Sequence, residues 1–124
     1  MKNIYTWAAV PAKRNLTVGD LKAAKGKKKF TQVTANTIAE ARAAEKADFD
    51  MIISNAFNVK KVREGSKNIF LTAALVLNKF VTNEDIMRGA FEALENGADA
   101  VMTPRSMDVV EMLAKEDVPV MGHL

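Results

Sequence analysis

The sequence predicts an α/β protein built from repeated βα units whose strands run parallel. Short runs of apolar and β-branched residues alternate along the chain with amphipathic stretches, and the links between them are tight. The run at 49–54 is compact and apolar, and the run at 68–77 is continuously apolar, which is typical of a parallel strand buried on both faces. The order β-α-β-α-β-α-β-α-β therefore implies one parallel sheet with right-handed crossovers.

Residues 1–15 show no clear period and are expected to form an N-terminal arm, so the βα-repeat domain is expected at 16–124. Within it we expect strands at 30–35, 49–54, 68–77, 99–103 and 118–124. Helices are expected at 17–25, 36–47, 58–67, 82–97 and 106–117.

Capping residues support these helix boundaries. Thr17 and Asp20 form an imperfect capping box, and either Asn36 or Thr37 begins the next helix. The helix at 82–97 starts at Thr82 or Asn83 and stops at Gly97, and the last helix begins at Ser106. Six methionines at apolar positions are expected in the core: Met51, Met87, Met102, Met107, Met112 and Met121.

Composition limits the functional classes. The 124 residues suggest one domain, and the absence of cysteine excludes disulfides and thiolate metal sites and fits a cytoplasmic protein. No apolar run is long enough to span a membrane. The basic stretch at 22–30 lacks interleaved aromatic residues, so we interpret it as a solvated helix end and expect no nucleic-acid partner.

Two architectures fit the element order. One is a five-stranded, doubly wound sheet of flavodoxin type. The other is the N-terminal half of a TIM (β/α)8 barrel. The sequence shows no helix after the last predicted strand, and a parallel strand left at an uncovered edge is unfavourable. This favours the half-barrel, whose open edges would also promote a homo-oligomer.

The predicted strands end in polar residues. In parallel α/β folds the chemistry lies at the C-terminal ends of the strands. Those ends carry almost no carboxylate and offer Thr34, Asn36, Ser54, Asn55, Thr72, Thr103, Arg105 and His123.

Four phrases carry a resemblance to a known family. They are KKKFTQVTA (27–35), DFDMIIS (48–54), VTNEDIMRGAFEALENGADAV (81–101) and EDVPVMGHL (116–124). In order and spacing they resemble the first half of ketopantoate hydroxymethyltransferase, a barrel of the phosphoenolpyruvate mutase/isocitrate lyase-like group. The resemblance implies an enzyme of pantothenate biosynthesis that adds a one-carbon unit from methylenetetrahydrofolate to 3-methyl-2-oxobutanoate, with Mg²⁺ holding the oxo acid.

The chain departs from that family where the metal would bind. The family's Asp-Ser pair falls on Asn55 and Ala56, its next Asp on Ala74, and its Lys and Glu on Met102 and Pro104. Only the histidine matches, as His123, and the link at 55–67 is much shorter than the family's lid region. Because Mg²⁺ prefers carboxylate oxygens, the residues support neither the metal nor the folate-dependent reaction.

The remaining candidates point to a small acid. His123 could act as acid, base or donor, and Arg105 could grip a carboxylate or phosphate, although it could also be a solvated arginine before a helix. Asn55, with Ser54 and Thr103 beside the strand ends, could bind the same ligand, or Asn55 could cap a turn. Two functions stay open: a divergent relative with aldol-type chemistry altered or lost, and a non-catalytic binding or assembly module.

Overall fold

A five-stranded parallel sheet organises the molecule, which is described over residues 1–124 by a computed structural model. The strands lie in the sequential order β3-β4-β5-β6-β7. Their bounds are Gln32–Thr34 (β3), Met51–Asn55 (β4), Phe70–Ala74 (β5), Ala100–Thr103 (β6) and Val120–Gly122 (β7). The flavodoxin-like alternative is wrong, because that fold places its second strand outside the first, in the order 2-1-3-4-5.

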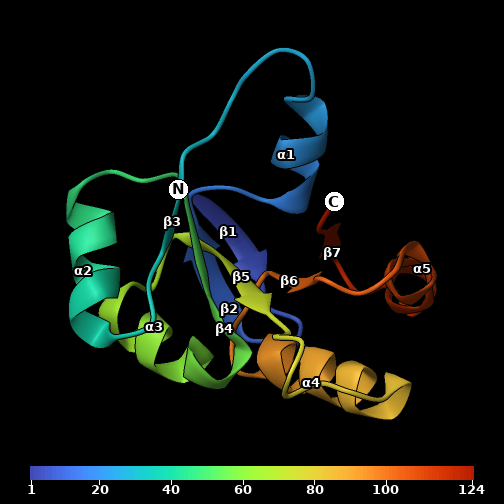
Figure 1. The fold of residues 1–124 in the computed structure, drawn as a ribbon. Coiled ribbons are helices and arrows are strands. Elements are labelled where there is room, and N and C mark those ends of the chain that lie inside the picture. Colours follow the sequence, from blue (N-terminus) through green and yellow to red (C-terminus); the bar gives the residue numbers. More distant parts are fainter.

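The crossover helices lie around the outside of this curved sheet, as expected for part of a barrel (Figure 1). Helix α1 stands apart from them, on the opposite side of the strands (Figure 1). The bounds are Val18–Ala23 (α1), Ile38–Lys46 (α2), Val59–Gly65 (α3), Asn83–Glu95 (α4) and Met107–Lys115 (α5), with a 3-10 turn, η1, at Ala56–Asn58. Every strand and helix expected in the repeat domain is present, and the half-barrel prediction is confirmed.

Threonines begin three of the helices. Thr17, Thr37 and Thr82 each accept a hydrogen bond from the third helical residue, whose carboxylate in turn accepts from the threonine N–H. The choice between Asn36 and Thr37 is thereby decided in favour of Thr37. Ser106 stands at the start of α5 but makes no side-chain capping bond.

The two faces of the sheet are different. The outer face packs on the helices through fully buried Ile52, Leu71 and Val101, and it belongs to the main apolar core. The inner face carries Phe70 and Ala100, which are buried without belonging to that core. Alternation along each strand separates the two sets.

The prediction that all six methionines lie in the core is correct for only two of them, and Met51 and Met102 are half-buried outside the main apolar core. Met87 and Met112 pack against the core. Met107 is 52% exposed and Met121 is 38% exposed. Met107 opens α5 at the end of the sheet, and Met121 lies on the outermost strand, so neither is enclosed by a neighbouring layer.

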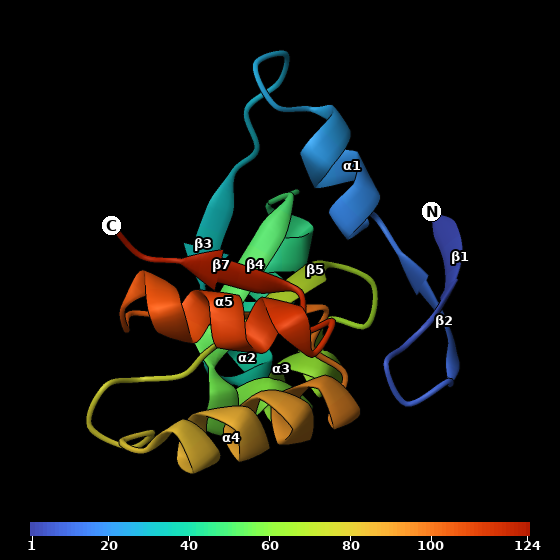
Figure 2. The same cartoon turned by 90° about the vertical axis from the view of Figure 1, so that its right-hand side faces the viewer.

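The N-terminal arm is an antiparallel hairpin, which the sequence analysis did not predict. Strand β1 (Lys2–Tyr5) pairs with β2 (Pro11–Arg14), and the hairpin lies on the side of the molecule opposite the C-terminus (Figure 2). The Trp7 ring stacks on Phe91 of α4 with centroids 5.5 Å apart. Asn15 then joins the sheet by donating to the Asp50 carbonyl (2.8 Å) and accepting from the Phe70 N–H (2.8 Å).

A buried ion cluster fixes the hairpin to the sheet. Asp99 accepts from Arg14 Nε through both carboxylate oxygens, at 2.9 and 3.0 Å, and from Arg63 Nη2 at 2.6 Å. Burial lowers the pKa of Arg63 to about 10, the attraction of Asp99 opposes this effect, and Arg14 adds to it. Arg63 therefore stays cationic at neutral pH.

No helix in the structure combines the length and the apolar character that a membrane crossing requires.

Candidate functional site

The C-terminal ends of the strands meet along one edge of the inner face. Parallel pairing sets Asn55 of β4 beside Ala74 of β5, Ala74 beside Met102 of β6, and Met102 beside Met121 of β7. This row, Asn55–Ala74–Met102–Met121, occupies the position where a parallel barrel carries its chemistry. It offers one amide, one methyl group and two thioethers.

The side chain of Asn55 already has a structural partner. Its Oδ1 accepts from the Phe57 N–H at 3.0 Å, which caps η1. The Asn55 N–H donates to Asn36 Oδ1 at 2.7 Å, and Asn58 Nδ2 donates to the same oxygen at 3.2 Å. The turn-capping alternative for Asn55 is thus realised, while its side-chain NH₂ makes no hydrogen bond within the protein.

Ser54 and Thr103 lie beneath the surface. Both are essentially inaccessible, at 1% and 0% exposure. Ser54 Oγ donates to the Asn55 carbonyl at 3.2 Å, and Thr103 Oγ1 accepts from the Arg105 N–H at 3.2 Å. These two hydroxyls therefore support the strand ends from below and do not line the surface.

Arg105 reaches back over the end of the sheet. Its Nη2 donates to the carbonyls of Leu77 (2.8 Å) and Phe80 (3.1 Å), and its Nε is buried without a partner. The guanidinium thus holds the β5–α4 loop, so the alternative of a freely solvated arginine is wrong. Like the Asn55 NH₂, the Arg105 Nε–H has no hydrogen-bond partner within the protein.

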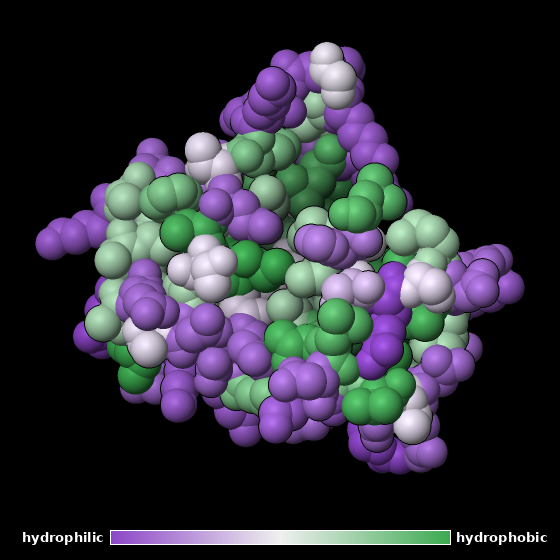
Figure 3. Space-filling view, in the orientation of Figure 1, coloured by the Kyte–Doolittle hydropathy of each residue, from purple (hydrophilic) through white to green (hydrophobic).

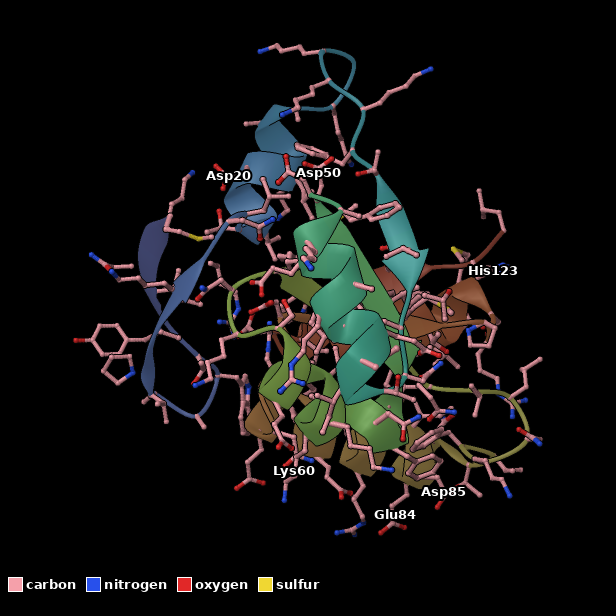
Figure 4. The ribbon with its side chains drawn as sticks, turned by 90° about the vertical axis from the view of Figure 1, so that its left-hand side faces the viewer. Asp20, Asp50, Lys60, Glu84, Asp85 and His123 are labelled. Carbon is pink, nitrogen blue, oxygen red and sulfur yellow. The ribbon has the colours of Figure 1, made fainter.

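His123 follows β7 and is exposed. Figure 4 shows it away from the labelled carboxylates, with Asp20 and Asp50 at one end of the molecule and Glu84 and Asp85 at the other. The fold therefore places His123 at the same edge as Asn55 and Arg105 but gives it no carboxylate neighbour among these four.

The residues at this edge do not fit a magnesium ion. Mg²⁺ requires hard oxygen ligands in near-octahedral geometry, and the row supplies a single amide oxygen, which caps η1. No group of three or more His, Cys, Asp or Glu side chains that could hold a metal is present in the molecule.

Apolar side chains surround the strand ends, a feature that the sequence analysis missed. The exposed set that follows the strands is Phe57, Leu77, Val81, Met107 and Met121. The Phe57 ring stacks on Phe80 with centroids 5.1 Å apart. Two of these residues, Phe57 and Val81, fall in predicted loops, where polar residues are usual, and could have revealed part of this surface from the sequence.

Fold and site together define a part-barrel α/β protein whose strand ends lack the carboxylates of a metal site. A rubisco-like protein from Burkholderia fungorum has a similar fold, with a TM-score of 0.57 and 15% identity over 90% of this chain and 35% of its own. At this identity the likeness concerns the fold alone. No family model matches the chain.

Five relatives in sequence carry the name 3-methyl-2-oxobutanoate hydroxymethyltransferase. The protein of Pyrobaculum calidifontis is 32% identical over 137 residues, covering 90% of this chain and 52% of its own length. That of Kosmotoga olearia is 30% identical over 125 residues, covering 81% and 47%. The protein of Deinococcus radiodurans is 42% identical over a shorter stretch of 71 residues, which covers 52% of this chain and 25% of the length of that protein.

The resemblance to ketopantoate hydroxymethyltransferase is therefore confirmed, and the chain is a divergent relative of these proteins. It spans about half the length of the curated relatives that it matches over most of its own length. The alignment with the Kosmotoga olearia protein is 125 residues long, but it covers only 81% of the 124 residues of this chain. That relative carries extra residues inside the aligned region, in keeping with the short link between β4 and β5 here.

Proposed function

We propose that this chain binds a small organic acid, a 2-oxo acid or a phosphorylated acid, at the C-terminal ends of its strands without a divalent metal. The carbon–carbon chemistry named in its relatives would be altered or lost. A cytoplasmic location remains part of this proposal.

One observation carries the proposal. Across β4, β5 and β6 the terminal row reads Asn55, Ala74 and Met102, where the resemblance implies acidic and basic side chains in an enzyme that uses Mg²⁺. An enolate forms at neutral pH only where a cation or well-placed hydrogen-bond donors stabilise it, and this row offers no cation. An acid could still be held by neutral donors and by cations at the rim.

Each candidate residue would have a defined role. His123, exposed beside the row, would donate to the acid or move a proton at its oxo group. The Asn55 NH₂ would supply hydrogen bonds that the protein itself does not use, and the half-buried Arg105 would supply the positive charge of its guanidinium. Ser54 and Thr103 would hold the strand ends in place and would not touch the ligand.

Thermal unfolding with 3-methyl-2-oxobutanoate, with and without Mg²⁺, tests the proposal. A ligand at 100 times its Kd that binds only the folded state adds ~2.7 kcal/mol to the free energy of unfolding. We expect the acid to raise Tm equally with and without Mg²⁺, and His123→Asn to reduce the shift. A shift that requires Mg²⁺ would contradict the proposal.

A gain-of-function variant sharpens the test. Asn55→Asp with Ala74→Asp places two carboxylates side by side in the row, since the two residues are register partners. We expect this double variant to be less stable than the parent and to recover stability on addition of Mg²⁺. Asn58→Asp adds a single carboxylate in η1, next to the row but outside it, and this control should not respond to Mg²⁺.

Self-assembly is a second candidate function, favoured by the charges at the two open edges of the sheet. Lys27, Lys28 and Lys29 precede β3, and Glu116 and Asp117 precede β7. If β7 of one copy paired in parallel with β3 of another, the lysines of one would lie beside the acids of the other. Continued pairing of this kind would join copies edge to edge.

Sedimentation measures this directly. We expect association that weakens at high salt and is abolished by changing the three lysines to glutamate. Mixing that variant with Glu116→Lys/Asp117→Lys should restore association, whereas Lys60→Glu/Lys61→Glu, on α3, is the control with the same kind of charge change. A monomer at all concentrations would exclude this function.

A further inference from the structure

A cavity of about 890 Å³ lies between α1 and the inner face of the sheet. Its volume falls in the range of small-molecule pockets, roughly 300–1,000 Å³. Val18 and Leu21 of α1 form one wall, and Met51, Phe70 and Ala100 of the sheet form the other. Apolar residues gather in the middle of the face drawn in Figure 3, below the position of α1.

One polar group on the cavity wall has no partner. Thr72 is 1% exposed, and its Oγ1 makes no hydrogen bond. It lies on the inner face of β5, between Ile53 and Ala100 in the register, and lines the cavity. A buried hydroxyl without a partner is unfavourable, so a purely apolar occupant would leave this defect in place, whereas an occupant with a polar atom would remove it.

The charges at the rim indicate the other end of the occupant. Lys22 and Lys25, from α1 and the segment after it, line the cavity on one side, and Asp117 lines it near β7. The ammonium groups of Lys22 and Lys25 favour an anionic group of the occupant on the α1 side, and the Asp117 carboxylate disfavours an anionic group beside β7.

We propose that this cavity binds an apolar carboxylic acid with a hydroxyl or carbonyl group at the far end of its chain. The carboxylate lies at Lys22 and Lys25, the chain packs on Met51 and Phe70, and the distal oxygen pairs with the Thr72 hydroxyl. The site shares Met121 with the terminal row but is otherwise distinct from the acid site proposed at the strand ends, because neither Asn55 nor His123 lines the cavity.

Calorimetric titration with two probes, decanoate and 10-hydroxydecanoate, tests the assignment. The parent protein should bind the hydroxy acid about fivefold to tenfold more tightly, the usual effect of one buried hydrogen bond. Thr72→Val keeps the side-chain shape and removes the hydroxyl, so the two probes should then bind equally. Thr34→Val is the matched control, because Thr34 lies in the same row of the sheet but does not line the cavity.

The rim is tested separately. Lys22→Gln/Lys25→Gln should weaken the binding of decanoate at least fivefold and leave the binding of 1-decanol unchanged, while Lys60→Gln/Lys61→Gln on α3 should change neither.

Equal binding of decanoate and 10-hydroxydecanoate by the parent protein, or an undiminished preference for the hydroxy acid in Thr72→Val, would overturn the proposal. So would a failure of both acids to bind, whether or not the protein associates with itself. His123→Asn should leave all these values unchanged, so this result and that of the strand-end site can be told apart.

Discussion

Replacing Asp99 with asparagine should remove much of the stability margin of this protein. Asp99 is the one carboxylate between two arginines, and the side chains of Arg14, Asp99 and Arg63 are 3%, 11% and 13% exposed. It also accepts from the Leu71 N–H at 2.9 Å. The asparagine side chain would keep the shape and could accept one of these bonds, but it would leave two buried cations with no anion.

The magnitude follows from that imbalance. Removing one partner of a buried ion pair costs ~3–5 kcal/mol, a large share of the ~5–15 kcal/mol that stabilises a typical domain. For a chain of this size, a loss of that order lowers Tm by ~10 °C or more. The backbone carbonyls of Lys13, Lys67 and Gly97, which also accept from Arg14, soften the effect without removing the charge.

Urea unfolding followed by circular dichroism measures the change. Asp48→Asn is the control, because Asp48 is exposed, makes no side-chain hydrogen bond, and has a positive φ of 60° that asparagine tolerates. The cluster also joins the hairpin to the sheet, so Asp99→Asn should increase hydrogen exchange in β1 and β2. A loss below ~1 kcal/mol would refute the view that Asp99 neutralises buried charge.

Three further outcomes follow from local geometry. Gly65→Ala should destabilise the protein by ~1–3 kcal/mol, because a Cβ there would overlap the Ile38 carbonyl and approach Ala41 Cβ to 2.8 Å. Gly19→Ala is the control, because the nearest atom to a Cβ at that position is 3.5 Å away. The urea midpoints of unfolding of the two variants would show the difference. Hydrogen bonds from the Thr82 backbone and hydroxyl lower the pKa of Asp85 from its ordinary value of 3.8. The ionised carboxylate therefore stabilises the folded state above the ordinary pKa, and this stabilisation is lost as the pH falls through the lowered pKa of the folded state. An NMR titration of Thr82→Ala should move that pKa upward, and an unchanged value would contradict the role of the hydroxyl. Arg105→Gln should increase amide hydrogen exchange in residues 75–81, because the shorter side chain can no longer donate to the carbonyls of Leu77 and Phe80. Protection equal to that of the parent protein would argue against this contact.

Much of the fold could be predicted from local patterns. The apolar run at 68–77 predicted a strand buried on both faces, and all five residues of β5 are buried. Thr17, Thr37 and Thr82 marked helix starts because a capping box involves residues only three apart. The N-terminal hairpin was missed because its strands lack apolar alternation and are held by Arg14 and Asn15, whose partners lie far along the chain.

The candidate site could be predicted only in part. The order of strand ends identified which residues would meet, because parallel strands place their C-terminal ends at one edge. It could not show that Arg105 is bound to the carbonyls of the β5–α4 loop, or that Ser54 and Thr103 lie beneath the surface. Those facts depend on how a loop folds back over the sheet, which short-range spacing does not encode.

The sequence by itself determined the βα repeat, the parallel sheet and the scarcity of carboxylates at the strand ends, because each depends on residue type and local period. Only the tertiary structure decided which polar side chains are paired, which are buried without a partner and which are exposed. It paired Asp99 with Arg14 and Arg63, enclosed the Thr72 hydroxyl without a partner, and left His123 exposed at the edge of the sheet. These outcomes depend on contacts between residues distant in the chain, and packing in three dimensions brings such contacts about.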